Sequence, residues 1–390
     1  MANILTYAQE YRNKNYKEEP FCIVDSLILC QLSYYAYEDG AFKKIFFNKK
    51  ISEYFQEQSK NNVKIFVNSM LTAAEDAKMI SILAGGGRHG DIRACGYVEE
   101  FCAETEKQFA GITFELDKGL YYIAFRGTDT SVVGWKEDFA LSFQEEIPAQ
   151  RAALLYVEEM MLRYPGQFYI GGHSKGGNLA VYAAMNLPEA LQRRIKQVYS
   201  FDGPGFLREV YEKSRYENIK SIVSKIIPQS SVVGLILEEH ADYKVVCSSA
   251  ELHIQHNPYT WQVQGKEFVY LDSEDSFSKL VKRSLDGWLD ELDLAERKRI
   301  INAIFGVLYD TGIASLYELT ELPREKLKQV LKCISNVDPE EKRLVVIAVK
   351  RFLGIASEEL RHAAKEETAL QFEKIVMLLE KRIAKLDSEQ

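Results

Sequence analysis

The sequence predicts an α/β protein in which a mostly parallel sheet is flanked by helices. Two observations support this class. Short apolar strands alternate with helical segments from about residue 112 to residue 227, the order expected for a parallel sheet covered on both faces. Helical spacing dominates residues 1–90 and returns from Ser276 onwards. The predicted organisation is an N-terminal helical region (1–90) that packs on the core, an α/β core (91–272) and a C-terminal all-helical subdomain (273–390).

The composition narrows the classes of protein to consider. The 390 residues include 49 Lys and Arg against 57 Asp and Glu, a net charge of −8 that argues against a nucleic-acid binder. The six cysteines form no CxxC pair, so neither a disulfide framework nor a zinc site is expected. The N-terminus has no apolar signal core, and no run of about 18 apolar residues occurs. We expect a cytoplasmic protein without a transmembrane segment, a metal or a cofactor.

Two helices are predicted in the N-terminal region. Residues Ile23–Leu32 are apolar on nearly every face, which is typical of a buried helix. Residues Val63–Leu83 have helical spacing and end at a run of three glycines, which is a stop signal. The loop that follows reads GGGRHGD. It lacks the GK[ST] ending of a phosphate-binding P-loop and is interpreted as an ordinary loop.

The core begins with a predicted hairpin. Residues Ile112–Leu116 and Leu120–Phe125 flank Asp117-Lys118-Gly119, which is a turn sequence. Further strands are predicted at Phe168–Ile170, Val198–Phe201 and Ile222–Ile227. Helices are predicted at Trp135–Phe143, Pro148–Arg163, Asn178–Asn186 and Phe206–Tyr216.

The C-terminal subdomain contains a clear helix start. Asp338 provides an N-cap carboxylate, and Pro339 occupies the first helical position. Nearer the end, six apolar residues form a helical stripe: Phe372, Ile375, Val376, Leu379, Ile383 and Leu386. The sequence does not indicate which protein, if any, these helices bind.

The most informative motif is Gly172-His173-Ser174-Lys175-Gly176, which matches the G-x-S-x-G pattern. In that pattern the serine occupies a strained turn between a strand and a helix, and here an apolar strand precedes it and a helical segment follows it. Side chains at Gly172 and Gly176 would collide with neighbouring elements. The alternative is a glycine-rich turn that only lets strand and helix pack closely. The context favours Ser174 as a nucleophile.

A second polar turn is expected beside the serine. The apolar strand Leu120–Phe125 runs into Arg126-Gly127-Thr128, before the nucleophile strand, where an oxyanion-hole loop is expected. The N–H groups of Thr128 and of Lys175, the residue after the serine, are the predicted oxyanion donors. The alternative is an ordinary loop between a hairpin and a helix.

These motifs together carry a resemblance to a known family. Phe125-Arg126-Gly127-Thr128, then Trp135 and Asp138, then the GHSKGG motif resemble the class 3 lipases of the α/β-hydrolase superfamily. The chain is more closely similar to a bacterial lipase-like (Mbeg-like) family with the same core. The likeness covers about residues 95–260. It implies an α/β-hydrolase-like fold, a place for Thr128 in the oxyanion hole, and a supporting role for Asp138 beneath the Thr128 turn.

The triad acid departs from the lipase pattern. Class 3 lipases usually carry an Asp at the end of the strand that here ends in Pro228-Gln229-Ser230-Ser231, where no carboxylate occurs. Asp202 lies at the carboxyl end of the preceding strand, where catalytic groups gather in such sheets, and α/β-hydrolases can place the acid there. Asp202 is the predicted acid, although it also suits a turn before Gly203. Weaker alternatives are Glu238, Glu239 and Asp242.

The general base is expected later in the chain than the serine. His256 lies in a loop before Trp261, and the lipase-like family has a histidine in a similar Gln-His…Trp setting, so His256 is the predicted base. His253 is the next candidate. Three other histidines are assigned no catalytic role. They are interpreted as a surface residue beside Glu238 and Glu239, a packing residue beside the serine, and part of the terminal helix, in the order His240, His173 and His362.

The residues predict a lipase-like or esterase-like serine hydrolase that acts on a small-molecule ester or a lipid-like substrate through Ser174, His256 and Asp202. A thioesterase or amidase would use the same site. A different class is a catalytically silent hydrolase fold that serves as a binding module. A third alternative is a lipase with a helical lid that contacts a membrane surface.

Overall fold

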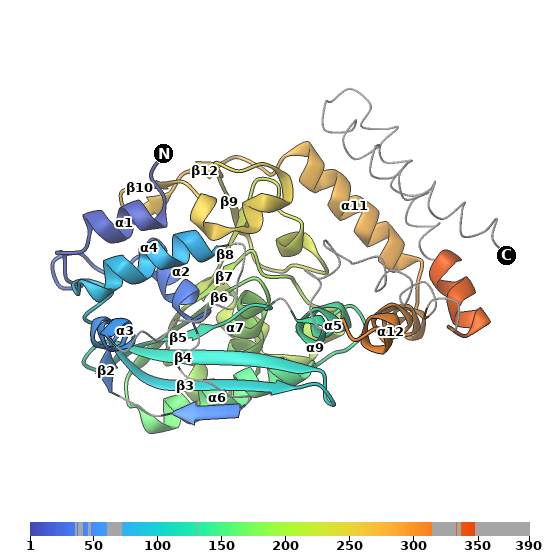
Figure 1. Cartoon of the computed structure of the whole chain (residues 1–390), viewed down its shortest axis with the longest axis horizontal. Coiled ribbons are helices and arrows are strands. Elements are labelled where there is room, and N and C mark those ends of the chain that lie inside the picture. The colour runs from blue at the N-terminus through green and yellow to red at the C-terminus, as the bar shows by residue number, and fades with distance from the viewer. Residues whose placement is uncertain are drawn as a thin grey trace.

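The computed structural model describes residues 1–35, 37, 42–45, 48–60, 72–129, 131–313, 333 and 337–347. These residues form an α/β-hydrolase-like fold around one large sheet, with helices on both faces (Figure 1). Among them, no helix is both long enough and apolar enough to cross a membrane. No group of three or more potential metal ligands occurs in the described part of the chain.

The sheet is parallel in its centre and antiparallel at both edges. Its order is β1-β3-β4-β5-β6-β7-β8-β9-β12, and β2 also pairs with β3. The parallel strands are β5 (Leu120–Phe125), β6 (Gln167–His173), β7 (Ile195–Phe201), β8 (Val223–Pro228) and β9 (Tyr243–Val246). The antiparallel strands are β1 (Phe42–Ile45), β2 (Lys49–Lys50), β3 (Arg93–Cys102), β4 (Lys107–Asp117) and β12 (Tyr270–Leu271). A separate pair is β10 (Val263–Gln264) and β11 (Glu267–Phe268).

Two layers of helices cover the sheet. The first layer contains α1 (Ile4–Glu10), α2 (Ile23–Leu32), α3 (Ile51–Lys60) and α4 (Ala73–Ala84). The second contains α6 (Pro148–Arg163), α7 (Lys175–Asn186), α9 (Arg208–Lys213) and α10 (Tyr216–Ile219). Side chains alternate along β5: Ile123 and Phe125 join the core of the second layer, and Tyr122 and Ala124 join that of the first.

Short elements complete the core. They are α5 (Val132–Ala140), α8 (Glu189–Gln192) and four 3₁₀ turns: η1 (Lys220–Ile222), η2 (Val233–Leu235), η3 (Leu252–His256) and η4 (Pro258–Thr260). Towards the C-terminus, α11 (Ser276–Asp290) and α12 (Leu294–Asp310) follow, and α12 lies beside α5 in Figure 1.

The central element predictions are confirmed. Helices α2 and α6 have the predicted bounds, and β4 and β5 form the predicted hairpin. Several corrections arise: β1 and β2 lie within the region predicted to be helical, and β9 is a strand that was not predicted from the sequence. The strand Arg93–Cys102, which pairs with β4, was not anticipated, because its charged end EEFCAETEK resembles a loop. Within the predicted helix Phe206–Tyr216, α9 covers only Arg208–Lys213 and ends at Ser214, where the backbone is extended, and α10 begins at Tyr216.

The N-terminal predictions are partly testable. Helix α4 lies within the predicted segment, whereas residues 61–71 are outside the described part of the chain. A helix does begin at Pro339, and the carboxylate of the preceding Asp338 accepts a hydrogen bond from the N–H of Glu340 (2.9 Å). His362 and the stripe from Phe372 to Leu386 lie outside the described residues.

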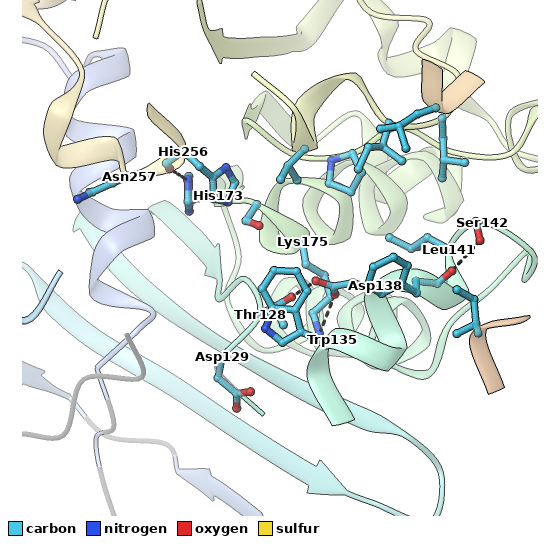
Figure 2. Close-up of a pocket in the computed structure, with 18 of the residues that line it drawn as sticks. Thr128, Asp129, Trp135, Asp138, Leu141, Ser142, His173, Lys175, His256 and Asn257 are labelled. Atoms are coloured by element: carbon cyan, nitrogen blue, oxygen red, sulfur yellow. Dashed lines mark hydrogen bonds and ion pairs between the residues drawn. The ribbon is translucent and has the colours of Figure 1, made fainter. Parts of the chain in front are cut away.

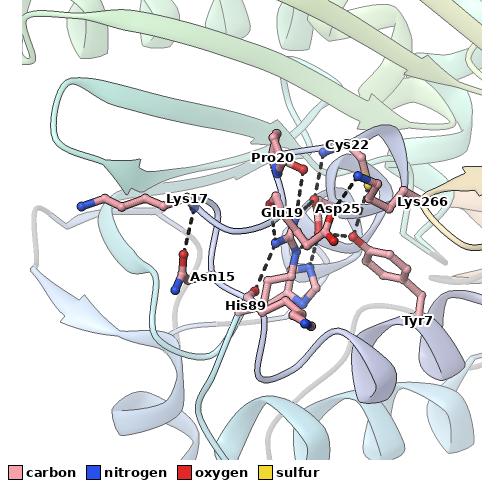
Figure 3. Close-up of polar contacts among 11 residues, drawn as sticks. Tyr7, Asn15, Lys17, Glu19, Pro20, Cys22, Asp25, His89 and Lys266 are labelled. Carbon is pink, nitrogen blue, oxygen red and sulfur yellow. Dashed lines mark hydrogen bonds and ion pairs between the residues drawn. The ribbon is translucent and has the colours of Figure 1, made fainter.

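The loop GGGRHGD has a structural role that its composition did not indicate. Asp25 of α2 is fully buried and accepts hydrogen bonds from Arg88 Nε (2.7 Å), Arg88 Nη2 (2.6 Å) and His89 Nε2 (2.7 Å), and from the Tyr7 hydroxyl at 3.0 Å (Figure 3). Burial alone would raise the pKa of Asp25, but the bonds from Arg88 and His89 hold it well below its ordinary value. This ionic cluster fastens α1, α2 and the loop to one another.

Candidate active site

Ser174 occupies a strained turn between β6 and α7. Its backbone has φ 58° and ψ −134°, in the left-handed half of the map that non-glycine residues rarely adopt. The Ser174 N–H donates to the carbonyl of Phe201 on β7 (2.9 Å), which holds the turn against the neighbouring strand. The arrangement is the strand–turn–helix geometry that the motif predicts.

The two motif glycines allow that turn to form. A Cβ atom on Gly172 would lie 2.1 Å from the carbonyl carbon of Gly176, and one on Gly176 would lie 2.2 Å from the carbonyl oxygen of Phe125. Both obstacles are backbone atoms, so side-chain rotation cannot relieve them. The glycines thus let β6, α7 and the end of β5 approach closely.

Replacement of Gly176 by alanine is expected to lower the free energy of unfolding by about 3 kcal/mol or more, because the backbone must move to admit the new atom. Urea unfolding followed by circular dichroism measures the loss. Gly306 in α12 is the matched control: a Cβ atom added there would have no described atom within 4 Å. Gly306→Ala should be neutral or stabilise the protein by up to about 1 kcal/mol. Equal effects at the two positions would contradict the close-packing argument.

His256 and Asp202 form a hydrogen-bonded pair. His256 Nδ1 lies 2.6 Å from Asp202 Oδ2, and Asp202 is fully buried at the end of β7. The other carboxylate oxygen accepts from the Ser231 hydroxyl (2.5 Å) and the Gly234 N–H (3.1 Å). Burial raises the pKa of Asp202, but the hydrogen bond and charge of His256, followed by the Ser231 bond, bring it below the ordinary value. The pair leaves Nε2 as the free ring nitrogen of His256 among the described contacts.

His173 has a different environment from His256. Its ring nitrogens contact the Tyr34 hydroxyl (3.0 Å) and the backbone carbonyl of His256 (2.8 Å). Burial, and then the nearby His256, lower the pKa of His173 to about 3. A neutral ring with both nitrogens occupied suits the expected packing role. Through its bond to the His256 carbonyl, His173 also holds the loop that carries His256.

Thr128 lies on the turn after β5 and faces the pocket. Its hydroxyl donates to Asp138 Oδ2, so Asp138 supports the Thr128 turn. Among the described residues, the backbone N–H groups of Thr128 and Lys175 have no hydrogen-bond partner. Both residues line the same pocket as Ser174, and α7 begins at Lys175 with its positive dipole end towards the serine. Two backbone N–H donors without a partner among the described residues, those of Thr128 and Lys175, therefore belong to residues that line the pocket with Ser174.

The pocket contains the serine, the histidine and a long apolar wall. Its volume is about 330 Å³. Figure 2 shows His256, His173 and Asn257 at one end, Thr128, Trp135 and Asp138 in the middle, and Leu141 and Ser142 at the other end. The C-terminal helices α11 and α12 contribute Leu285, Trp288, Leu289, Arg297 and Ile301 to the lining. In the described contacts, the Ser174 hydroxyl makes no hydrogen bond to His256, although both groups face this space.

The alternative acids and bases lie elsewhere. His240 stacks on Tyr211 with ring centroids 3.9 Å apart and lies 3.5 Å from Glu238, while Glu239 pairs with Lys225. Asp242 is exposed at the surface. The backbone of His253 belongs to η3, but its side chain is outside the described part of the chain. The four alternative candidates with described side chains do not line the pocket: Glu238, Glu239, His240 and Asp242.

Comparison with known proteins identifies the family. The model of the Mbeg1-like family matches residues 83–306, more than half of the chain. The chain belongs to the Mbeg1-like family. The resemblance predicted from the FRGT turn and the GHSKGG motif is thereby confirmed.

Two solved structures are similar to this Mbeg1-like chain. The crystal structure of M37 lipase has 15% sequence identity over 54% of this chain and 68% of that one, with a TM-score of 0.33. The Rhizomucor miehei lipase in its propeptide complex has 16% identity over 59% of this chain and 75% of that one, also with a TM-score of 0.33. No curated protein sequence matches the chain.

Several residues of this Mbeg1-like site were not identified from the sequence. Tyr34 holds His173, Ser231 holds Asp202, and Trp288 reaches the pocket from α11. Gln108 and Glu137 contact the Lys175 side chain. The one local signal is Lys175 itself, a lysine between the motif serine and two glycines. The others come from segments far apart in sequence.

Proposed function

We propose that the protein is a serine hydrolase that cleaves carboxylic esters with an apolar acyl group. One observation carries the proposal. A serine on a strained strand–helix turn shares a pocket with a histidine whose Nδ1 is bonded to a buried carboxylate. Family membership is consistent with this chemistry but does not define the substrate.

The proposed reaction begins with proton transfer. His256 Nε2 takes the Ser174 proton as Oγ attacks the ester carbonyl carbon, and Asp202 stabilises the imidazolium that forms. The Ser174–His256 bond needed for this step forms when substrate is bound, since catalytic hydrogen bonds are often long in unliganded sites. The free N–H groups of Thr128 and Lys175 stabilise the oxyanion.

The second half of the reaction restores the enzyme. The carbon–oxygen bond to the alcohol breaks, and His256 gives its proton to the departing oxygen, which leaves an acyl-Ser174. Water, deprotonated by His256, then attacks the acyl carbon and releases the acid. Leu285, Trp288 and Ile301 provide an apolar wall for the acyl chain.

A fluorophosphonate probe tests the proposal directly. The folded protein should react covalently at Ser174, located by mass spectrometry of the labelled peptide. It should also hydrolyse p-nitrophenyl esters, with kcat/KM rising from acetate to a medium-chain ester as the apolar wall is filled. Matched thioester and anilide substrates distinguish a thioesterase or an amidase from an esterase. A folded protein that neither labels nor cleaves any of these substrates would leave the silent binding module as the better interpretation.

A further inference from the structure

A buried ion pair lies directly beneath the candidate oxyanion hole. Lys175 Nζ is 2.8 Å from Glu137 Oε2, 2.8 Å from Gln108 Oε1 and 3.0 Å from the Gln108 carbonyl oxygen. The side chains of Lys175 and Glu137 are 1% and 0% exposed. A buried charge is costly unless it is paired and hydrogen-bonded, and here all three ammonium donors have acceptors. The pair is therefore a buried and fully hydrogen-bonded ionic contact.

Glu137 extends this network to two more elements. Its Oε2 also accepts from the Gln108 N–H on β4 (3.1 Å), and its Oε1 accepts from the Ala149 N–H at the start of α6 (2.8 Å). Lys175 belongs to α7, directly after the nucleophile, and Glu137 belongs to α5. The network thus joins the element that carries one predicted oxyanion donor to the helix that supports the other.

Asp138 lies next to the Lys175–Glu137 pair, and only one of its two carboxylate oxygens has a hydrogen-bond partner. Its Oδ2 accepts from the Thr128 hydroxyl, whereas its Oδ1 is buried without a hydrogen bond and lies 3.6 Å from Lys175 Nζ. Charges of both signs therefore act on this carboxyl: attraction to Lys175 and repulsion from Glu137. Other ionisable groups nearby are Asp129 on the same turn, Tyr34 after α2, and Arg297, which enters the pocket from α12.

We propose that Lys175 and Glu137 act as positioning residues that set the charge of Asp138, and thereby decide whether Thr128 is held in the oxyanion hole. When Asp138 is ionised, it attracts the Thr128 hydroxyl and the Lys175 ammonium at once, which fixes the turn against α7. When Asp138 is protonated, the attraction to Lys175 is lost and the turn is less firmly held. Ser174 and His256 need not move in either state.

The electrostatic balance supports this arrangement. Burial, the largest influence, raises the pKa of Asp138 to about 6, while the charge of Lys175 and the Thr128 bond lower it and the charge of Glu137 raises it. Removal of the lysine charge should consequently move the pKa of Asp138 upwards, and removal of the glutamate charge should move it downwards. Opposite displacements would show that the two charges act on Asp138, and the pH dependence of kcat then tests the effect on Thr128.

The test is a ¹³C NMR titration of the Asp side-chain carboxyl carbons in the full chain. The Asp138 resonance is assigned by its absence from Asp138→Asn. Compared with the unsubstituted protein, Lys175→Met should raise the midpoint, and Glu137→Gln should lower it. The double variant Lys175→Met/Glu137→Gln removes both charges, so neither partner is left charged and unpaired. Its Asp138 midpoint should lie between that of Lys175→Met and that of the unsubstituted protein. If Lys175→Met does not fold, the midpoint of the double variant still tests the effect of the two charges on Asp138.

Lys136→Met is the matched control. Lys136 is also on α5, but its ammonium group pairs with Glu106 (2.7 Å) rather than with Asp138, so its loss should leave the Asp138 midpoint unchanged. Midpoints that stay fixed in Lys175→Met and Glu137→Gln, or that move in the same direction, would overturn the inference. So would a midpoint that moves equally in Lys136→Met.

The kinetic part of the inference rests on the proposed function. In Lys175→Met, the ratio of kcat at pH 8 to kcat at pH 6 for a p-nitrophenyl ester should rise about threefold or more, while Glu137→Gln should lower the ratio. Binding of ester, reported by KM, should change little in both. If the unsubstituted protein cleaves no ester, the proposed function fails, yet the NMR titration still decides the electrostatic inference. If the Asp138 midpoint shifts in opposite directions in the two variants but the ratio of kcat at pH 8 to kcat at pH 6 does not change, then the charge of Asp138 does not control Thr128.

Discussion

Ser174→Ala should abolish ester hydrolysis while leaving the fold intact. We expect kcat to fall by on the order of 10⁴- to 10⁶-fold, because no other described group in the pocket is placed to form the acyl intermediate. Alanine occupies the same strained backbone conformation with one atom fewer, so the melting temperature should change little. Initial rates on a p-nitrophenyl ester and a thermal melt measure the two effects. KM should be nearly unchanged, because the apolar wall and the oxyanion donors remain.

Ser249→Ala provides the control for this substitution. The Ser249 hydroxyl is exposed and donates to the Thr260 carbonyl (3.1 Å), outside the pocket. This variant should retain full activity and full fluorophosphonate labelling. If Ser174→Ala keeps more than about a tenth of the activity, then Ser174 is not the nucleophile.

Asp202→Asn should reduce kcat by on the order of 10⁴-fold, a loss comparable with those of triad acids in other serine hydrolases. The carboxylate now accepts the proton on His256 Nδ1 at 2.6 Å. An amide NH₂ group at this place would donate to Nδ1 and force the proton onto Nε2, the nitrogen that must receive the Ser174 proton. Activity is measured as for Ser174. Fluorophosphonate labelling should slow in parallel, because it needs the same activated serine.

The weaker candidate acids serve as controls. Glu238→Gln and Asp242→Asn lie outside the pocket and should retain activity within about twofold. Ser231→Ala keeps the Asp202 carboxylate but removes one of its hydrogen bonds, so an intermediate loss is expected. Full activity in Asp202→Asn would show that His256 does not depend on this acid.

The local part of the site could be predicted from the sequence. The φ of 58° at Ser174 follows from a short motif with two obligatory glycines. The sequence predicts Asp202 from its place at the end of a strand, and His256 from its place after the serine and from the family resemblance; the structure brings them together across 54 residues. The reason is topological: β7 ends beside β6, and the loop after β9 returns over the carboxyl ends of the strands.

The remainder of the site depends on packing that has no local signal. The hydroxyl of Ser231 takes the position near the strand end where a carboxylate was sought, and it bonds to the acid on the next strand. Trp288 reaches the pocket only because α11 borders it while α12 packs against α5, which no pattern in residues 276–310 indicates. The same is true of Tyr34, which reaches His173 across 139 residues of sequence.

The shared core of the N-terminal helices has a consequence for synthesis of the chain. Helix α2 is among the first elements made, yet its apolar residues pack with Phe201, Ile226, Trp261 and Phe268. Ribosomes add about 5–20 residues per second, so the helix waits roughly 10–50 seconds for its last partners. During that interval Leu27, Ile28 and Leu29, all fully buried in the finished protein, have no complete core to enter. The nascent chain is thus most vulnerable to aggregation until β11, which carries Phe268, has been made.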